Sequence, residues 1–153
     1  MLCRYYCQVH AQGPGAIRGS IPPMEEIEEC SFVRLLPDGS PVVSLRGRET
    51  VVDLYGIEIV HPTGDLYREI FLVRIPQARK PLRCKVHAVL PGGNIRTQLF
   101  CFGWQDKSGD VWLDLAVVLL REGLARVAPG EFPEREQYLE YEREVKSGER
   151  EES

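Results

Sequence analysis

Residues 30–59 alternate short apolar stretches with turn-forming residues, and this pattern constrains the fold more than any other feature of the chain. The stretches "SFVRLL", "VVSL" and "TVVDLYGIEI" are separated by "PDGSP" and "RGRE". Short apolar runs bounded by Gly, Pro, Asp and Ser predict β-strands joined by tight turns. We therefore expect three consecutive antiparallel strands in this part of the chain.

A second hairpin is predicted by "PLRCKVHAVL" and "IRTQLFCFGW", which flank the turn "PGGN". Apolar and polar residues alternate along the first of these, so one face of that strand is buried. A short strand over "VWL" follows. Phe100, Phe102 and Trp104 alternate in the same way. We predict that they pack in the core, with stacking platforms for nucleic-acid bases as the alternative.

Three segments are predicted to be helical. Leu66, Ile70 and Val73 have helical spacing in residues 63–75, and Pro76 ends that pattern. Asp114 is suited to cap a helix over "LAVVLLRE", which has to be buried because its apolar residues are consecutive. A surface helix is expected over residues 134–146.

These elements predict an α+β fold that is mainly β. A mostly antiparallel five-stranded sheet with helices added late in the chain suggests a small barrel that carries about three helices on one side. The 153 residues fit one domain, which we place at residues 24–146. Residues 1–23 are rich in Gly and Pro and are predicted to be a flexible leader, with Met24 as an alternative start. Residues 147–153 form a charged tail.

The cysteines argue against a disulfide framework because they are odd in number, widely spaced and without C-x-x-C pairs. We expect Cys84 and Cys101 to pack as small hydrophobic residues. A soft-metal site at Cys3, Cys7 and His10 lacks a fourth ligand, and a disordered tail is the favoured interpretation. The chain has no apolar run of membrane-helix or signal-peptide length, so a cytoplasmic location without a membrane partner is expected.

Charge is distributed unevenly along the chain. Residues 131–153 carry a net charge of -5 and residues 25–29 carry -4, whereas residues 30–130 carry +3. A mildly basic body between acidic ends gives only weak support for a nucleic-acid surface, because phosphate binding needs a concentrated basic face.

The stretch "LLPDGSPVVSLRGRETVVDLYGIEIVHP", followed by "LAVVLLREGLARV", resembles the staphylococcal (thermo)nuclease family. That family shows an Asp-Gly-Asp-Thr turn, then V-R-L-x-G-I-D-x-P-E, and later L-V-x-x-G-L-A-x-V. The resemblance covers about residues 30–146. It implies an OB-like five-stranded barrel packed on three helices, which active members use for calcium-dependent hydrolysis of DNA and RNA.

The resemblance also implies where a nuclease site would lie. The metal positions correspond to Ser40, a neutral side chain, and to Glu58, with Asp38 as a possible substitute ligand. His61 corresponds to the general base. Of the two arginines that would hold the phosphate, one corresponds to Arg96. We therefore assign catalytic candidates Arg96 and His61 and metal candidates Glu58 and Asp38.

The other phosphate-binding arginine of the family corresponds to Asp53, which has the opposite charge. A carboxylate at that place repels a phosphate. We favour a structural role for Asp53, paired with Arg46, Arg48 or Arg96.

Three functions follow as hypotheses. The first is a nuclease-like domain without hydrolytic activity that binds nucleic acid or an acidic protein segment. Arg46, Arg48 and Lys85 are its binding candidates, together with Arg34, Arg83 and Arg96. The second is an active calcium-dependent phosphodiesterase with a rearranged site. The third is a protein-binding module that uses the acidic C-terminal helix. We expect no cofactor in the first and third cases and Ca²⁺ in the second, and the oligomeric state stays open.

Overall fold

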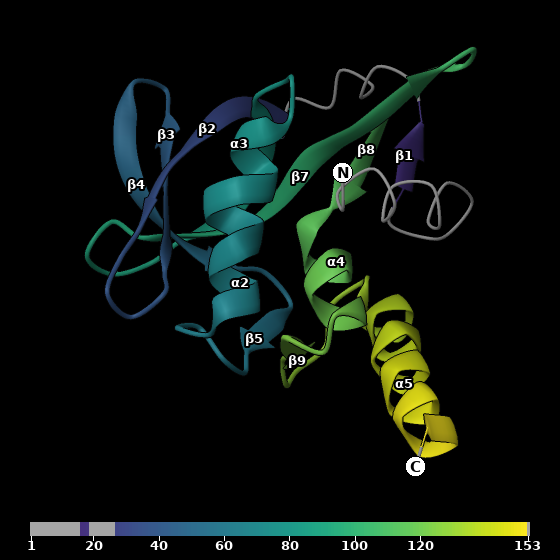
Figure 1. The fold of residues 1–153 in the computed structure, drawn as a ribbon. Coiled ribbons are helices and arrows are strands. Elements are labelled where there is room, and N and C mark those ends of the chain that lie inside the picture. The colour runs from purple at the N-terminus through teal and green to yellow at the C-terminus, as the bar shows by residue number, and fades with distance from the viewer. Residues whose placement is uncertain (1–15, 19–26, 153) are drawn as a thin grey trace.

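The computed structural model describes the backbone of residues 16–18 and 27–152 and the side chains of residues 27–145 (Figure 1). These residues form a mainly β, α+β structure, as the sequence predicts. The strands are β1 (Ala16–Arg18), β2 (Ile27–Leu35), β3 (Pro41–Leu45), β4 (Arg48–Leu54), β5 (Ile57–Ile59), β6 (Leu82–Val89), β7 (Ile95–Asp106), β8 (Gly109–Asp114) and β9 (Ala125–Val127). The helical segments are α2 (Asp65–Glu69), η1 (Ile70–Arg74), α3 (Ile75–Gln77), α4 (Leu115–Arg121) and α5 (Arg135–Glu152).

Five strands pair in a closed ring. β2, β3 and β4 are the predicted antiparallel meander, β4 then pairs with β7, β7 pairs with β6, and β6 pairs back with β2. The contact between β4 and β7 is parallel, whereas the other four contacts of the ring are antiparallel. This closure brings residues near 53 beside residues near 96, which positions the candidate site.

The predicted strand "TVVDLYGIEI" is divided by a turn. β4 ends at Leu54, Gly56 has a φ of +78°, and β5 begins at Ile57. β5 leaves the ring and pairs with β9 in a separate two-stranded sheet. A side chain at Gly56 would come within 2.9 Å of the rings of Phe132 and Tyr138, so the turn also needs a residue without a Cβ.

The helix predicted over residues 63–75 is present as one continuous helical segment made of α2, η1 and α3, beside β2 (Figure 1). It ends at Gln77, one residue beyond Pro76. Tyr67, Ile70 and Phe71 are buried in the core, whereas Leu72 and Val73 are exposed. The prediction that Val73 lies on the buried face of the helix is therefore wrong. The middle turn is a π-helix, so its side chains are displaced around the helix axis relative to α-helical spacing.

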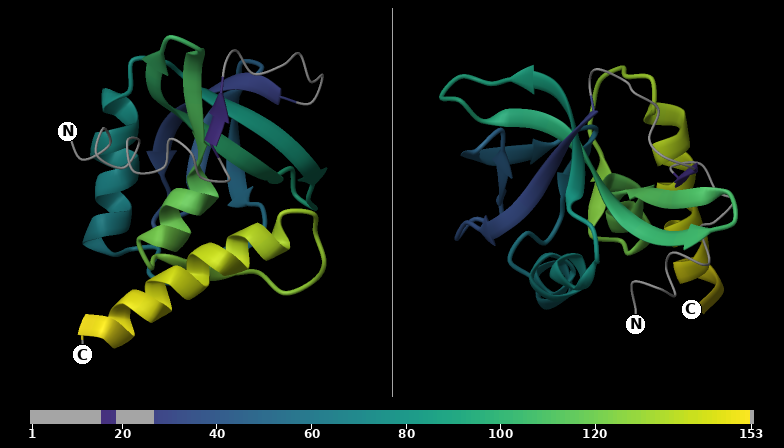
Figure 2. Two further views of the ribbon diagram at one scale, coloured as in Figure 1. Left: turned by 90° about the vertical axis from the view of Figure 1, so that its right-hand side faces the viewer. Right: turned by 90° about the horizontal axis from the view of Figure 1, so that it is seen from above.

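α4 is buried along nearly its whole length, as its apolar run predicts. Asp114 Oδ1 accepts a 3.0 Å hydrogen bond from the Ala116 amide, which confirms Asp114 as the N-cap. α5 begins at Arg135, close to the predicted position, but continues to Glu152 rather than ending near residue 146. It packs across α4 and β9, with Tyr138 and Tyr141 buried (Figure 2).

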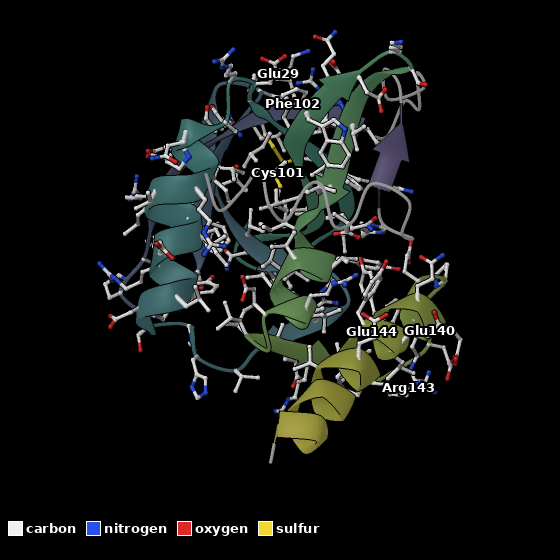
Figure 3. All side chains as sticks on the ribbon, turned by 45° about the vertical axis from the view of Figure 1, so that its right-hand side comes forward. Glu29, Cys101, Phe102, Glu140, Arg143 and Glu144 are labelled. Carbon is white, nitrogen blue, oxygen red and sulfur yellow. A yellow bond between two sulfur atoms is a disulfide. The ribbon has the colours of Figure 1, made fainter. Side chains whose placement is uncertain are left out.

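Cys30 and Cys84 form a disulfide, with their Cα atoms 6.1 Å apart. The prediction against disulfides was therefore wrong for this pair, and Cys84 is a cross-link rather than a free small residue. The two residues lie 54 positions apart in the chain but on β2 and β6, the strands that close the ring. Figure 3 shows the bond in yellow in the interior of the molecule. Cys101 is buried outside this cross-link, as expected.

The alternation of Phe100, Phe102 and Trp104 is broken by a register shift between Phe102 and Trp104. Phe102 packs edge-on against Trp112 at 5.6 Å, while Trp104 contacts the hydrophobic core. Phe100 is buried. The favoured prediction of packed aromatic residues is thus confirmed for Phe100 and Trp104.

The remaining sequence expectations concern the ends of the chain and membranes. Most of the predicted leader, residues 1–15 and 19–23, lies outside the described residues, as do Cys3, Cys7 and His10. Ala16–Arg18 form β1, which pairs with β8 at the end of the sheet. Among the described residues, no helix is both long enough and apolar enough to cross a membrane.

Candidate functional site

The turn between β2 and β3 is organised by Asp38. Its Oδ1 accepts a 2.9 Å hydrogen bond from the Ser40 amide, and the Leu36 amide donates to the Ser40 carbonyl oxygen at 2.9 Å. The Ser40 amide, followed by the Ser40 side chain, holds the pKa of Asp38 below its ordinary value. Asp38 therefore has the turn-forming role that "PDGS" predicts.

The segment before α2 packs directly on this turn. A Cβ added at Gly39, where φ is +91°, would lie 2.2 Å from the Pro62 carbonyl oxygen. Tyr67, from α2, donates its hydroxyl to the Gly39 carbonyl oxygen at 2.6 Å. Burial, followed by the charge of Asp38, raises the pKa of Tyr67, so this phenol stays protonated. Two elements therefore fix the position of Asp38.

A pocket of about 130 Å³ opens between this turn and β4. Its polar wall contains two carboxylates, Asp38 and Asp53, with Ser40 and Tyr67. The rest of the lining is Gly39, Pro41, Val52, Leu54, Ile59 and Pro62. Glu58 and His61 do not line this pocket. Of the two metal candidates, the pocket thus includes only Asp38.

Asp53 pairs with Arg96 across the parallel contact of the ring. The two residues are register partners on β4 and β7, and Arg96 Nε donates to Asp53 Oδ2 at 3.0 Å. Their side chains are 49% and 47% exposed, respectively. The structural role predicted for Asp53 is confirmed, and the register selects Arg96 from the three predicted partners. The one arginine assigned to the phosphate is therefore held by a carboxylate.

Glu58 has a similar partner outside the pocket. It faces Arg126 across the β5–β9 pair, and Arg126 Nε donates to Glu58 Oε2 at 2.8 Å. His61 is exposed, and its backbone carbonyl accepts a hydrogen bond from the Gly64 amide at 3.1 Å. In the part of the chain that the structure describes, no three His, Cys, Asp or Glu side chains are grouped as metal ligands.

The basic binding candidates are interleaved with carboxylates. Arg46 donates to both carboxylate oxygens of Glu28, at 2.6 and 2.7 Å, and this lowers the pKa of Glu28. Arg34 pairs with Glu49 at 2.6 Å. Arg83 pairs with Glu29 at 3.2 Å and lies over the Trp112 ring at 4.8 Å. Arg48 has no ion pair among the described side chains, and Lys85 lies on β6 with its register partner Gln98. These strands therefore present mixed charge rather than a concentrated basic face.

A buried polar network lies on the outer side of β7, and the sequence analysis did not identify it. Asp114 Oδ2 accepts hydrogen bonds from the Tyr138 hydroxyl at 2.5 Å and from Gln98 Nε2 at 3.1 Å. Gln98 Oε1 lies 2.8 Å from His87 Nε2. His87 stacks on Tyr55 with ring centroids 3.6 Å apart. The sequence signal for this network was the presence of polar residues inside apolar runs, an acid in "VWLDLAVVLL" and an amide in "TQLFCF".

No protein-family model matches the chain, and no curated protein sequence matches it. The residues and contacts described above are therefore the basis for any functional conclusion.

Proposed function

We propose that this chain is a staphylococcal-nuclease-like domain with an OB-like barrel that has lost phosphodiester hydrolysis and acts as a binding module. The proposal is supported by the closed ring of five strands with helical additions, since an OB fold is a five-stranded Greek-key barrel that presents a binding face. The motif "GIE" spans the turn before β5 and the start of that strand, and "LAVVLLREGLARV" covers α4 and β9.

The observation that carries the proposal is the pairing of Asp53 with Arg96. Phosphoryl-transfer sites use cationic groups to stabilise the charge that develops on the phosphate. Here Asp53 stands at the position of one expected arginine. Its carboxylate forms an ion pair with Arg96, the second expected arginine. A phosphate that approached Arg96 would have to displace Asp53 and would then lie beside its negative charge.

Calcium binding is also opposed by the observed contacts. Calcium takes six to eight oxygen ligands, and its affinity depends on the number of carboxylates. Glu58 pairs with Arg126, and Asp38 accepts a hydrogen bond from the Ser40 amide. At the position where the family has a second acid, this chain has Ser40, whose hydroxyl is neutral. We therefore propose that the domain needs no cofactor.

The partner that suits this surface is a protein segment with mixed or acidic charge rather than a nucleic-acid backbone. A phosphate backbone gains affinity by neutralising many charges with a concentrated set of bases. Arg34, Arg46 and Arg83 already have carboxylate partners at 2.6 to 3.2 Å. α5 offers a second protein-binding surface, because it continues to Glu152 and carries exposed acids such as Glu136, which is 81% exposed.

Digestion of labelled single-stranded DNA with and without Ca²⁺ tests the loss of hydrolysis. We expect no calcium-dependent cleavage by the wild-type chain and the same result for Glu58→Ala. Cleavage that Glu58→Ala abolishes would instead establish an active phosphodiesterase. Gel shifts at low salt test the partner. We expect at most weak oligonucleotide binding that does not depend on Arg96, and tight binding that Arg96→Ala removes would contradict a protein partner.

The cytoplasmic location is a further proposal that the Cys30–Cys84 disulfide opposes, and the state of these two cysteines tests it. Structural disulfides persist in oxidising compartments and are rare in reducing ones. Alkylation of thiols at the moment of cell lysis, followed by mass spectrometry of the Cys30 and Cys84 peptides, measures their state. Free thiols are expected for a cytoplasmic protein, whereas a cross-linked pair would place the protein in an oxidising compartment.

A further inference from the structure

The first turns of α5 are attached to the sheet by one buried carboxylate. Asp114 is 3% exposed at the end of β8, and Tyr138 is 1% exposed on α5. The Tyr138 hydroxyl donates to Asp114 Oδ2 at 2.5 Å. Because an unpaired polar group in such a position would be costly, separation of α5 from the sheet requires that water replace this contact.

The Asp114 carboxylate accepts hydrogen bonds from one backbone amide and two side chains. The Ala116 amide donates to Oδ1, while Gln98 Nε2 and the Tyr138 hydroxyl donate to Oδ2. Gln98 Nε2 also donates to the Tyr138 oxygen at 3.2 Å. An ionised carboxylate can accept all three bonds, whereas a protonated one also has to donate. The arrangement of this contact therefore depends on whether Asp114 carries a proton.

The groups that face Asp114 come from every element around it. α5 contributes Tyr138, and Glu134 precedes it in the loop. β7 contributes Gln98, whose Oε1 accepts from His87 Nε2 of β6. The turn after β4 contributes Tyr55, which stacks on His87 and donates its hydroxyl to Glu134 at 2.8 Å. None of these side chains is a lysine or arginine, so the charge of Asp114 is balanced by dipoles alone.

We infer that the docking of α5, which packs on α4 and β9 and meets β7 and β8 through Tyr138, is linked to protonation of Asp114, so that α5 is held more tightly at mildly acidic pH than at neutral pH. The inference does not depend on the proposed binding function. Undocking exposes Asp114 to water, and hydration favours its charged form. The docked state favours the neutral form, because it removes the carboxyl from water and places the negative charge of Glu134 nearby. Protonation and docking therefore favour each other.

The direction of this linkage agrees with the balance of forces on the group. Burial, the largest cause, raises the pKa of Asp114 to about 6, although the Tyr138, Ala116 and Gln98 donors oppose the shift. A separate contact also holds α5, because Arg121 pairs with Glu144 at 3.6 Å and lies over the Tyr141 ring.

Amide hydrogen exchange of the full chain between pH 5.0 and 7.5 tests the inference. The observable is the opening constant of the α5 amides near Tyr138 and Tyr141, corrected for the chemical exchange rate. We expect this constant to rise by about tenfold or more from pH 5.0 to 7.5 in the wild type. Asp114→Asn keeps an N-capping side chain and removes the charge, so its opening constant should be flat over the same range.

Three further variants separate the possible sources of a pH effect. Glu136→Gln removes an exposed acid of α5 and should behave like the wild type. His87→Gln tests the imidazole that contacts Gln98 and should also retain the wild-type slope. Tyr138→Phe removes a donor to the carboxylate and keeps the ring, so it should move the midpoint to higher pH. This last effect can be checked directly by NMR titration of the Asp114 carboxyl carbon.

A flat profile in the wild type would overturn the inference, as would an Asp114→Asn profile as steep as that of the wild type. Loss of the slope in His87→Gln with its retention in Asp114→Asn would assign the switch to the imidazole and equally overturn it. Far-UV circular dichroism of each variant confirms that a change in exchange comes from a folded chain. If Asp114→Asn does not fold, the NMR titration of the wild type and Tyr138→Phe decides the question alone, and a midpoint near the ordinary value of an aspartate would contradict the inference.

Discussion

Arg96 donates its Nε–H to Asp53 across the only parallel contact of the strand ring, at 3.0 Å, where the two residues are register partners. This pair determines how the candidate site behaves towards anions, because each member cancels the charge of the other. Asp53 also lines the pocket that contains Asp38. The contact is local in space but joins residues that are 43 positions apart in the chain.

The Asp53–Arg96 pair should contribute little to stability, because both side chains are about half exposed, at 49% and 47%. We expect Asp53→Ala and Arg96→Ala each to change the free energy of unfolding by less than about 1 kcal/mol, with a coupling energy below about 1 kcal/mol. Urea denaturation of the two single variants and the double variant measures both values. A coupling energy of several kcal/mol would indicate a desolvated pair and a different role for Asp53.

Gly39 should be far more sensitive to substitution than Gly47. Both have positive φ, at +91° and +78°, so a Cβ is strained at either position. Only at Gly39 does the added Cβ meet another segment, with the Pro62 carbonyl oxygen 2.2 Å away, whereas nothing lies within 4 Å at Gly47. We expect Gly47→Ala to cost about 1 kcal/mol and Gly39→Ala to cost about 2 kcal/mol more than that. Thermal denaturation of the two variants tests the difference, and equal costs would contradict the packing of residue 62 on this turn.

Arg74 joins the helical segment 65–77 to the end of α4, and its removal should be strongly destabilising. It is 8% exposed, and its guanidinium pairs with Glu122 at 3.3 Å and with Glu69 at 3.2 Å. Arg74→Ala leaves the largely buried Glu122 without this partner, which should cost about 3 kcal/mol. The matched control is Arg68→Ala on the exposed side of the same segment, with an expected change within about 0.5 kcal/mol. Similar melting temperatures for the two variants would exclude a structural role for the Arg74 contacts.

Reduction of the Cys30–Cys84 disulfide should lower stability without removing the fold. The bond joins residues 54 positions apart. A cross-link over such a loop lowers the entropy of the unfolded chain and so raises the free energy of unfolding by about 4 kcal/mol. We expect the melting temperature to fall in dithiothreitol for the wild type and for Cys101→Ala. The double variant Cys30→Ser, Cys84→Ser should melt at the same low temperature with or without reductant. A wild type that does not respond to dithiothreitol would show that the bond adds nothing to stability.

Global stability should decrease as pH rises from about 4 to 6 because of Asp114. Burial raises the pKa of this group from the ordinary value of an aspartate to about 6, so the folded state binds its proton more tightly than the unfolded state. The contribution is fully present below pH 4, is lost through pH 6, and amounts to about 3 kcal/mol. Urea denaturation at pH 4.5 and 7.0 should show about 2 kcal/mol of this loss in the wild type but not in Asp114→Asn.

The carboxyl groups of Asp38 and Glu28 affect stability in the opposite direction to Asp114 and over a lower pH range. Hydrogen bonds from Ser40 and Arg46, respectively, lower their pKa values. Their contributions are therefore present above the ordinary pKa of an acid and are lost as pH falls below about 4. The Asp38→Asn variant should keep the wild-type change between pH 4.5 and 7.0, and a loss of that change would argue against Asp114 as its source.

The sequence by itself determined the local structure of this protein. Alternating apolar residues and Gly-containing turns predicted β2, β3, β6 and β7, and Asp114 was identified as an N-cap, because each depends on interactions between residues close in the chain. The turn role of Asp38 followed from the same kind of local chemistry. The sequence also limited the partner of Asp53 to three arginines.

Only the tertiary structure decided which distant residues meet. Strand register selected Arg96 for Asp53 and Arg126 for Glu58, since a shift by one residue turns every side chain of a strand to the opposite face. Ring closure brought Cys30 to Cys84, which spacing in the sequence could not indicate. The tertiary structure also buried Asp114 beside Tyr138 and Gln98, which come from three separate elements. These contacts lie beyond the range of local sequence patterns, because they depend on how β2, β6, β7, β8 and α5 pack together.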